Sequence, residues 1–297
     1  MNTLFWAIPF FIVSMLVEWR LTQRHDVQGY RGKDSATSVA MGVGYLAISF
    51  SVKALTILPF LVAYEYRLFD LPTEAWWLWL ALIPAEDFCF YWYHRKSHEV
   101  RFLWAAHVNH HSSTSYNLST ALRQPWTAWI FGWVFWVPLA FLGFPPWMIF
   151  LAESLNLLYQ YWIHTELIDR MGAFESVFNS PSHHRVHHGS NAKYLDRNHG
   201  GTLIVWDRLF GTFAREEERP TYGLTSNIES HNPLHVAFHE WRALVRDIRE
   251  AHSWRGRLGY VFGPPGWRED GSGRTSEAIR LRALASEGRG DPTTQAS

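Results

Sequence analysis

The sequence predicts an all-α integral membrane protein with four to five transmembrane helices and a cytosolic, helical, histidine-rich metal domain. Residues 1–165 are strongly apolar, whereas the remainder of the chain is polar. Aromatic residues make up 16% of the chain and include 17 Trp, which is typical of the belts that anchor membrane helices at the lipid interface. No segment shows the strict alternation of a β-strand.

Residues 1–93 are expected to form the N-terminal transmembrane helices. Leu4–Val17 is apolar but short for a span, and a basic loop follows it, which the positive-inside rule places in the cytoplasm. Thr37–Tyr64 is the second expected span. It contains Lys53, which either snorkels, kinks the helix toward water or divides the stretch into two pieces. Ala75–Tyr93 is the third and returns to the cytoplasm.

Residues 94–215 form the expected di-metal catalytic region, which includes transmembrane helices at about 126–164. Trp126–Leu142 is the fourth expected span, residues 143–146 form a tight turn, and Trp147–Trp162 is the fifth. Five spans with the N-terminus outside place every histidine motif on the cytoplasmic face. Four spans, with the first two stretches forming a membrane-embedded hairpin, do the same.

The C-terminal part is expected to be cytosolic. Residues 216–269 form an amphipathic helical segment, in which the helix pattern of Asn232–Ile248 either packs on the membrane surface or covers the metal domain. Residues 270–297 are rich in Gly, Ser, Arg and Glu without apolar periodicity, so they are predicted to be mostly disordered. The formal net charge is zero, which gives no indication of nucleic-acid binding.

Half of the 16 histidines fall in three short boxes with the spacings HxxxH, HxxHH and HxxHH. The boxes contain His94 and His98, then His107, His110 and His111, then His184, His187 and His188. Histidines four residues apart lie on one face of a helix, where both imidazoles can bind one ion. Eight imidazoles exceed what one metal takes, so two metals are the economical count. A mere surface patch of histidines does not explain this repetition.

The residue types narrow the choice of metal. Imidazole suits iron, zinc, copper and nickel, while the scarcity of carboxylates argues against magnesium and calcium. Cys89 is the single cysteine, so thiolate zinc sites and iron–sulfur clusters are excluded, and no internal disulfide forms. A reducing compartment is consistent with that count.

Polar residues in the apolar segments point toward the same site. Glu153, Asn156, Gln160 and His164 form one stripe on the fifth expected span, and His164 emerges beside the boxes, which favours it as a further ligand. Asp87 lies two turns before the first box and either orients a ligand or makes an interhelical hydrogen bond.

Three residues after the third box have two interpretations. Asp196, Asn198 and His199 either orient ligands or serve as turn residues. His183, which directly precedes the third box, is a further residue whose part in the site is open.

Two metals in a nitrogen-rich cage beside a bilayer suit oxidation of a lipid, since iron there can activate dioxygen and attack an unactivated C–H bond. Hydroxylation and desaturation begin alike, so the sequence does not separate them. A zinc hydrolase is an alternative, although it usually needs three protein ligands. A membrane metal carrier is another, although carriers place their ligands near the bilayer midplane.

The boxes HRKSH, HVNHH and HRVHH resemble those of the fatty acid hydroxylase/sterol desaturase superfamily of membrane di-iron enzymes. The segments at 94–124, 156–168 and 179–213 further resemble the alkylglycerol monooxygenase branch, so the resemblance covers roughly residues 85–215. It implies hydroxylation of the carbon next to an ether oxygen, followed by collapse to an aldehyde and a glycerol. The alternative within the superfamily is a sterol or fatty acyl desaturase or hydroxylase with a separate electron donor.

The resemblance also implies the site and its cofactors. Two iron ions are implied, and tetrahydrobiopterin is the reductant of that branch. Glu99 is implied to take part in catalysis, and Gln160 stands where related hydroxylases have a further histidine. The implied iron ligands are His94, His98, His107, His110, His111, His164, His184, His187 and His188.

The expected partners are a lipid from the bilayer, dioxygen, the membrane and an electron source. The chain has neither a haem-binding HPGG element nor the cysteines of a ferredoxin, so electrons come from a soluble reductant or a separate electron-transfer protein. The expected location is a bacterial inner membrane, as a multi-pass protein with a cytoplasmic active site.

Overall fold

The computed structural model describes residues 4–25 and 29–287, and every regular element in those ranges is a helix, apart from two isolated β-bridges. The α-helices are α1 (Leu4–His25), α2 (Gly32–Glu65), α3 (Trp77–Glu99), α4 (Arg101–His111), α5 (Val137–Leu142), α6 (Pro146–Trp162), α7 (Pro181–His187), α8 (Val205–Leu209), α9 (Pro233–Glu250), α10 (Trp254–Phe262) and α11 (Ser276–Glu287). The 3₁₀ helices are η1 (Thr120–Leu122), η2 (Ala128–Ile130), η3 (Gly132–Phe135), η4 (Gly172–Ser176) and η5 (Ala192–Tyr194). The all-α class is therefore confirmed.

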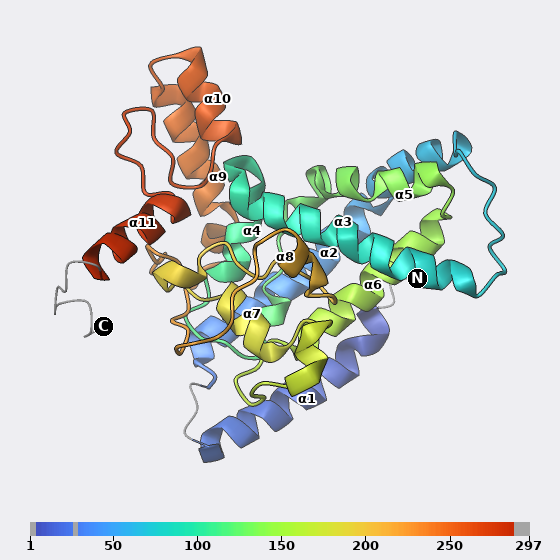
Figure 1. Cartoon of the computed structure of the whole chain (residues 1–297), viewed down its shortest axis with the longest axis horizontal. Coiled ribbons are helices and arrows are strands. Elements are labelled where there is room, and N and C mark those ends of the chain that lie inside the picture. The colour runs from blue at the N-terminus through green and yellow to red at the C-terminus, as the bar shows by residue number, and fades with distance from the viewer. Residues whose placement is uncertain (1–3, 26–28, 288–297) are drawn as a thin grey trace.

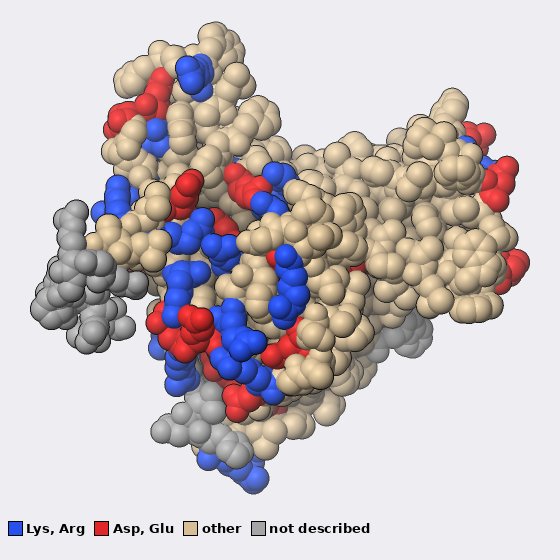
Figure 2. Space-filling view, in the orientation of Figure 1, with Lys and Arg blue, Asp and Glu red and all other residues tan. Residues whose placement is uncertain are grey.

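The helices form an apolar lobe that continues into a polar region. α3 packs against α4 and α6, while α2 packs against α5 (Figure 1). The space-filling view shows mostly uncharged surface over the lobe that carries α5, with acidic residues at its tip, whereas Lys and Arg, interspersed with Asp and Glu, gather around α7 (Figure 2). This distribution is what a membrane-embedded lobe with a polar end would show.

The lobe is held together by large apolar side chains from α3 and α6. Leu78, Leu82, Met148 and Ile149 are fully buried in one cluster. Within the described ranges, α2 is the one helix long and apolar enough to cross a membrane by length and composition. It runs without a break through Lys53, so the division of the second span into two pieces is wrong. The count of four to five spans stays a prediction.

The fourth expected span is not a continuous helix. Trp126–Leu142 instead contains η2, η3 and the six-residue α5. Pro138 lies in the first turn of α5, where its missing N–H is tolerated, so a new helix begins there and the preceding turn cannot continue through it. The expectation of one continuous helix over these residues is therefore wrong, and whether the segment crosses the membrane stays a prediction.

The turn and the helix that follow match the sequence expectation. Gly143 ends α5 with a φ of 114°, and a Cβ at this position would collide with the carbonyl oxygen of Phe69. Pro146 then begins α6, which carries the expected polar stripe toward His164. Asn156 and Gln160 in that stripe are both buried.

The C-terminal helices cover the histidine region. Asn232 caps α9 by accepting from two backbone N–H groups, and α9 packs on α4. Arg101 joins the two helices through ion pairs with Glu240 and Asp247. α9 therefore lies over the metal domain, which is one of its two expected placements, while its Leu234, Phe238 and Val245 are exposed.

The predicted disorder of residues 270–297 is not what the structure has over Ser276–Glu287, which forms α11. This helix packs beside η5, and Arg280 donates to the carbonyl of Leu195, so a tertiary contact that composition cannot reveal orders it. Residues 288–297 lie outside the described part of the chain.

Candidate metal centre

The structure brings all nine predicted histidines together in two adjacent groups. Within each group, the candidate ligand atoms lie within 4.8 Å of one another, and every member is buried. The first group contains His94, His98, His107, His111 and His187, and the second contains His110, His164, His184 and His188. The rings of His111 and His188, one from each group, stack with their centroids 4.5 Å apart, so the two groups are in direct contact.

The spacing of the boxes explains how the histidines divide. His107 and His111 are one helical turn apart on α4 and serve the first group, while His110 points to the second. The third box repeats the arrangement with the groups exchanged, because His184 and His188 serve the second group and His187 the first. Each His-His pair therefore contributes to both groups.

The separations between ring nitrogens are those of ligands around a shared ion. Nε2 of His107 lies 3.0 Å from Nε2 of His94 and 3.2 Å from that of His111. In the second group, Nε2 of His164 lies 3.0 Å from that of His184 and 3.4 Å from that of His110. Ligand nitrogens about 2.1 Å from one ion would be roughly 3.0 Å apart at right angles and roughly 3.4 Å apart at the tetrahedral angle.

Backbone carbonyls orient several of these rings through Nδ1. His94 Nδ1 lies 2.8 Å from the carbonyl oxygen of His199, and His187 Nδ1 lies 2.9 Å from that of Arg197. His164 Nδ1 lies 2.7 Å from the carbonyl oxygen of Gln160. A carbonyl only accepts, so Nδ1 carries the proton and the Nε2 lone pair is left free to bind a metal.

Buried nitrogens without partners test whether metal ions fit here. Among the described residues, Nε2 of His98, His187 and His188 has no hydrogen-bond partner. An unsatisfied buried polar atom is costly, and three of them converging in two groups require a common explanation. One metal ion in each group would satisfy them, so the donor set fits two ions of a metal that accepts imidazole.

Burial also keeps these imidazoles neutral. It lowers the pKa of His107, His111 and His187 well below 6.5, and neighbouring histidines lower it further. The same causes act on His184 and His188 in the second group. Neutral imidazole is the form that binds metal, so the groups are prepared for it near pH 7.

The metal-free protein should lose stability as the pH falls below about 6.5. Unfolded imidazoles then bind protons that the buried ones of His107 and His187 cannot, with a limit of roughly 1.4 kcal/mol per group and pH unit. Thermal unfolding of chelator-treated protein between about pH 7.5 and about pH 5.5 measures this. A melting temperature independent of pH across that range would contradict the buried, neutral state.

Other predicted site residues lie outside both groups. Glu99 pairs with Arg95 at 2.6 Å and with Lys96 at 2.7 Å, and its side chain is about one-third exposed. The amide of Gln160 donates to Asn156, so this residue contributes its backbone carbonyl and not its side chain. His183 is buried against the ring of Phe213.

Asp87 makes the interhelical hydrogen bonds that were one of its two interpretations. Its carboxylate accepts from the backbone N–H groups of Thr202 and Leu203 at 2.6 and 3.0 Å and from Trp206 at 2.9 Å. Gly201 allows this approach, since a Cβ there would lie 2.9 Å from the carboxylate. Asp87 thus ties α3 to the segment after the third box.

His199 is closer to the first group than the sequence indicated. Its ring is buried and lies 5.0 Å from that of His98 and 5.7 Å from those of His94 and His187. Its position in the sequence, outside any HxxxH or HxxHH spacing, gave only the weaker signal of a ligand-orienting group.

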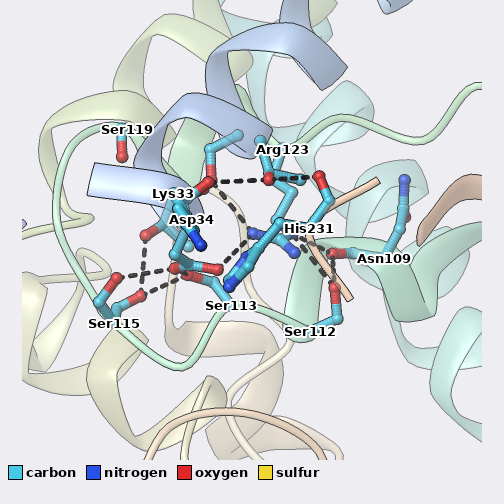
Figure 3. A network of polar contacts seen from close by, with 12 residues as sticks. Lys33, Asp34, Asn109, Ser112, Ser113, Ser115, Ser119, Arg123 and His231 are labelled. Carbon is cyan, nitrogen blue, oxygen red and sulfur yellow. Dashed lines mark hydrogen bonds and ion pairs between the residues drawn. The ribbon is translucent and has the colours of Figure 1, made fainter. Parts of the chain in front are cut away.

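A buried polar network joins α2 to the C-terminal end of α4 and the segment after it (Figure 3). Arg123 is 1% exposed and donates to Asp34 on α2 at 2.8 Å. It also donates at 3.0 Å to the carbonyl of Asn109, which directly precedes His110. Ser115 donates to the same carboxylate at 2.7 Å. No pattern in the sequence indicates this role for Arg123.

The segment that contains both histidine groups resembles a known protein family. Residues 79–212 match the family model described as fatty acid hydroxylase. The chain contains a fatty acid hydroxylase domain. This domain begins in α3 before the first box and includes both histidine groups, since the last of their members is His188.

The similarity to curated proteins covers more of the chain than residues 79–212. The chain is 41% identical over 266 residues to an alkylglycerol monooxygenase from Homo sapiens, covering 88% of this chain and 59% of that protein. It is 38% identical over 262 residues to one from Xenopus tropicalis, covering 88% and 58%. Ornithine lipid hydroxylase OlsE from Rhizobium tropici is 30% identical over 135 residues, covering 45% and 40%.

The chain thus spans about three-fifths of the length of the alkylglycerol monooxygenases that it matches. No solved structure matches it.

Proposed function

We propose that this chain is a membrane-bound di-iron oxygenase that hydroxylates a lipid C–H bond, with an alkylglycerol ether as its substrate. The observation that carries the proposal is the pair of adjacent, buried histidine groups inside a fatty acid hydroxylase domain. The alkylglycerol monooxygenases at 38–41% identity support the choice of substrate.

The nine histidines would hold one iron ion in each group. Bound there, the iron supplies activation of dioxygen and attack on an unactivated C–H bond. The chain keeps each Nε2 turned inward by fixing Nδ1 on a carbonyl, as at His94, His164 and His187. Burial of the ligands excludes bulk water from the reacting centre.

The proposed reaction inserts one oxygen atom into the C–H bond of the carbon next to the ether oxygen. The second oxygen atom leaves as water, with two electrons and two protons from the reductant. The resulting hemiacetal breaks its C–O bond to give an aldehyde and a free glycerol hydroxyl. The reductant is tetrahydrobiopterin or, failing that, an external electron-transfer protein.

Two other functions fit the observations less well. A zinc hydrolase needs about three protein ligands and an open position, whereas four and five imidazoles converge here. A sterol or fatty acyl desaturase would use the same metal centre. The 30% identity to an ornithine lipid hydroxylase supports hydroxylation of a different lipid as a further alternative.

The proposed location is a bacterial inner membrane, with several spans and the histidine groups at the cytoplasmic face. The gathering of Lys and Arg around α7, away from the acidic tip of the apolar lobe, supports that orientation (Figure 2).

Turnover of an alkylglycerol tests the proposal. Detergent-purified, iron-loaded protein is supplied with a 1-O-alkylglycerol, dioxygen and reduced tetrahydrobiopterin, and the fatty aldehyde is measured by mass spectrometry. Aldehyde with one oxygen atom derived from labelled dioxygen is expected. The ester analogue is the matched control, because its carbonyl replaces the methylene group that the reaction attacks.

Each other outcome is informative. Hydroxylated fatty acid or desaturated sterol in a parallel screen, without aldehyde, would replace the ether substrate while keeping the oxygenase. No oxygen consumption with any lipid or reductant, including a ferredoxin and its reductase, would contradict the oxygenase itself.

A further inference from the structure

One short loop orients most of the first histidine group. The loop, residues 196–199, supplies the carbonyl of His199 to His94 Nδ1 and the carbonyl of Arg197 to His187 Nδ1. Its Asp196 carboxylate lies 3.5 Å from Nδ1 of His98. Three of the five members of the first group are therefore positioned by four consecutive residues, here called the orienting loop.

The second group has no equivalent among the described residues. His164 is oriented by Gln160 of α6, the helix that leads to it. Nδ1 of His184 has no hydrogen-bond partner in the described part of the chain. The contacts of the orienting loop with ligand rings therefore all fall on the first group.

The orienting loop has a backbone that must be held in place. Asp196 has a φ of 53° and Asn198 a φ of 57°, in the left-handed region that costs most residues about 1 kcal/mol or more. The Asn198 amide donates to the carbonyls of His183 and Ala214 at 3.0 and 2.8 Å. Such a conformation persists only where surrounding contacts over-determine it.

The far end of the orienting loop is fixed by α8. The Asp207 carboxylate accepts from the backbone N–H groups of His199 and Gly200, both at 2.7 Å. Thr212 donates to the same carboxylate at 2.6 Å. These bonds hold the His199 carbonyl against His94.

The near end is fixed by the C-terminal helix. Arg280 of α11 donates at 2.6 Å to the carbonyl of Leu195, the residue directly before the orienting loop. Its guanidinium also interacts electrostatically with Asp196 and Arg197. The attraction between Arg280 and Asp196 favours contact of α11 with the loop. The repulsion between Arg280 and Arg197 opposes this contact, and the hydrogen bond from Arg280 to Leu195 offsets it. α11 lies outside residues 79–212, the part that matches the family.

We propose that α11, through Arg280, acts as a clamp on the orienting loop and sets the metal affinity of the first histidine group selectively. This inference rests on the proposed metal centre. Arg280 is a positioning residue, since it contacts the loop and no ligand. Groups that orient metal ligands typically contribute a factor of 10–100 in metal affinity.

The test compares variants of Arg280 and Asp196 by metal titration of the full chain, with Fe(II) and separately with Zn(II). Asp196→Ala is expected to weaken one of the two binding steps by roughly 10–100-fold, because Asp196 lies beside a ligand. Arg280→Ala is expected to weaken the same step by a smaller factor and to leave the other step unchanged, because Arg280 acts through the loop. Arg280→Lys and Asp196→Asn should restore part of the loss, because each keeps the donor or acceptor. Arg282→Ala, at an exposed position on the same helix, is the matched control and should bind like the wild type.

Single-site backgrounds identify the affected group. His110→Ala retains the first group, so adding Arg280→Ala should weaken the remaining site by the same factor as in the wild-type background. His187→Ala retains the second group, and there Arg280→Ala should change nothing. Equal weakening in both backgrounds, or none in either, would overturn the clamp. The proposed metal centre is judged separately, by whether the wild type binds two ions.

Discussion

Replacing His187 with alanine is expected to remove one metal ion from the protein and leave the other bound. His187 belongs to the first group and reaches it through an Nε2 that has no other partner among the described residues. The second group keeps all of its histidines, whereas the first keeps four of five and should hold its ion less tightly. After dialysis against a competing chelator, metal per chain should fall from about two toward about one, and activity should fall by more than the roughly 10–100-fold that loss of an outer partner costs. Elemental analysis with a turnover assay measures both.

His110→Ala is the reciprocal variant, because His110 belongs to the second group although it adjoins His111 of the first. It should also retain about one ion per chain, in the opposite site. His235→Ala on the exposed face of α9 is the matched control and should keep both ions and full activity. Full activity in His187→Ala and His110→Ala together, or a dead His235→Ala enzyme, would refute the assignment of the two groups.

Replacing Arg123 with methionine is expected to destabilise the protein by about 3–5 kcal/mol, since it leaves the Asp34 carboxylate buried without its ionic partner. Both side chains are almost completely buried, at 1% and 4% exposed, and the bond joins α2 to the segment after α4 (Figure 3). The substitution also removes the hydrogen bond from Arg123 to the carbonyl of Asn109, which then still accepts from Ser112, so α4 loses a support beside His110. Thermal unfolding of the detergent-solubilised variant measures the effect.

A second substitution separates charge from packing. Asp34→Asn added to Arg123→Met should recover part of the stability, because it removes the uncompensated charge. Arg249→Met at an exposed position on α9 is the control and should be nearly neutral. If Arg123→Met unfolds like the wild type, the network in Figure 3 does not hold α2 to α4.

The histidine groups could be predicted because the spacing that defines them lies within short stretches of sequence. An HxxHH box on a helix places its first and last histidines on one face and directs the middle one elsewhere, and this is how α4 and α7 serve both groups. His164 was found from the polar stripe on α6, where a polar residue in an apolar helix must face other protein.

What could not be anticipated depends on contacts between distant segments. The orienting loop acts through the carbonyls of Arg197 and His199, and a backbone carbonyl leaves no signature in the sequence. The composition of α11 resembles that of a disordered tail, and its order comes from contact with the segment before that loop. Asp34 and Arg123 are 89 residues apart, so their pairing is not visible in any local pattern.

The metal content of the detergent-purified wild-type protein, combined with Mössbauer spectroscopy, tests the central claim most directly. Two adjacent histidine groups, each able to hold one ion, predict about two irons per chain. Coupled iron at that ratio would establish the class of centre. Tightly bound zinc alone, with no oxygen consumption after reconstitution with iron, would contradict it.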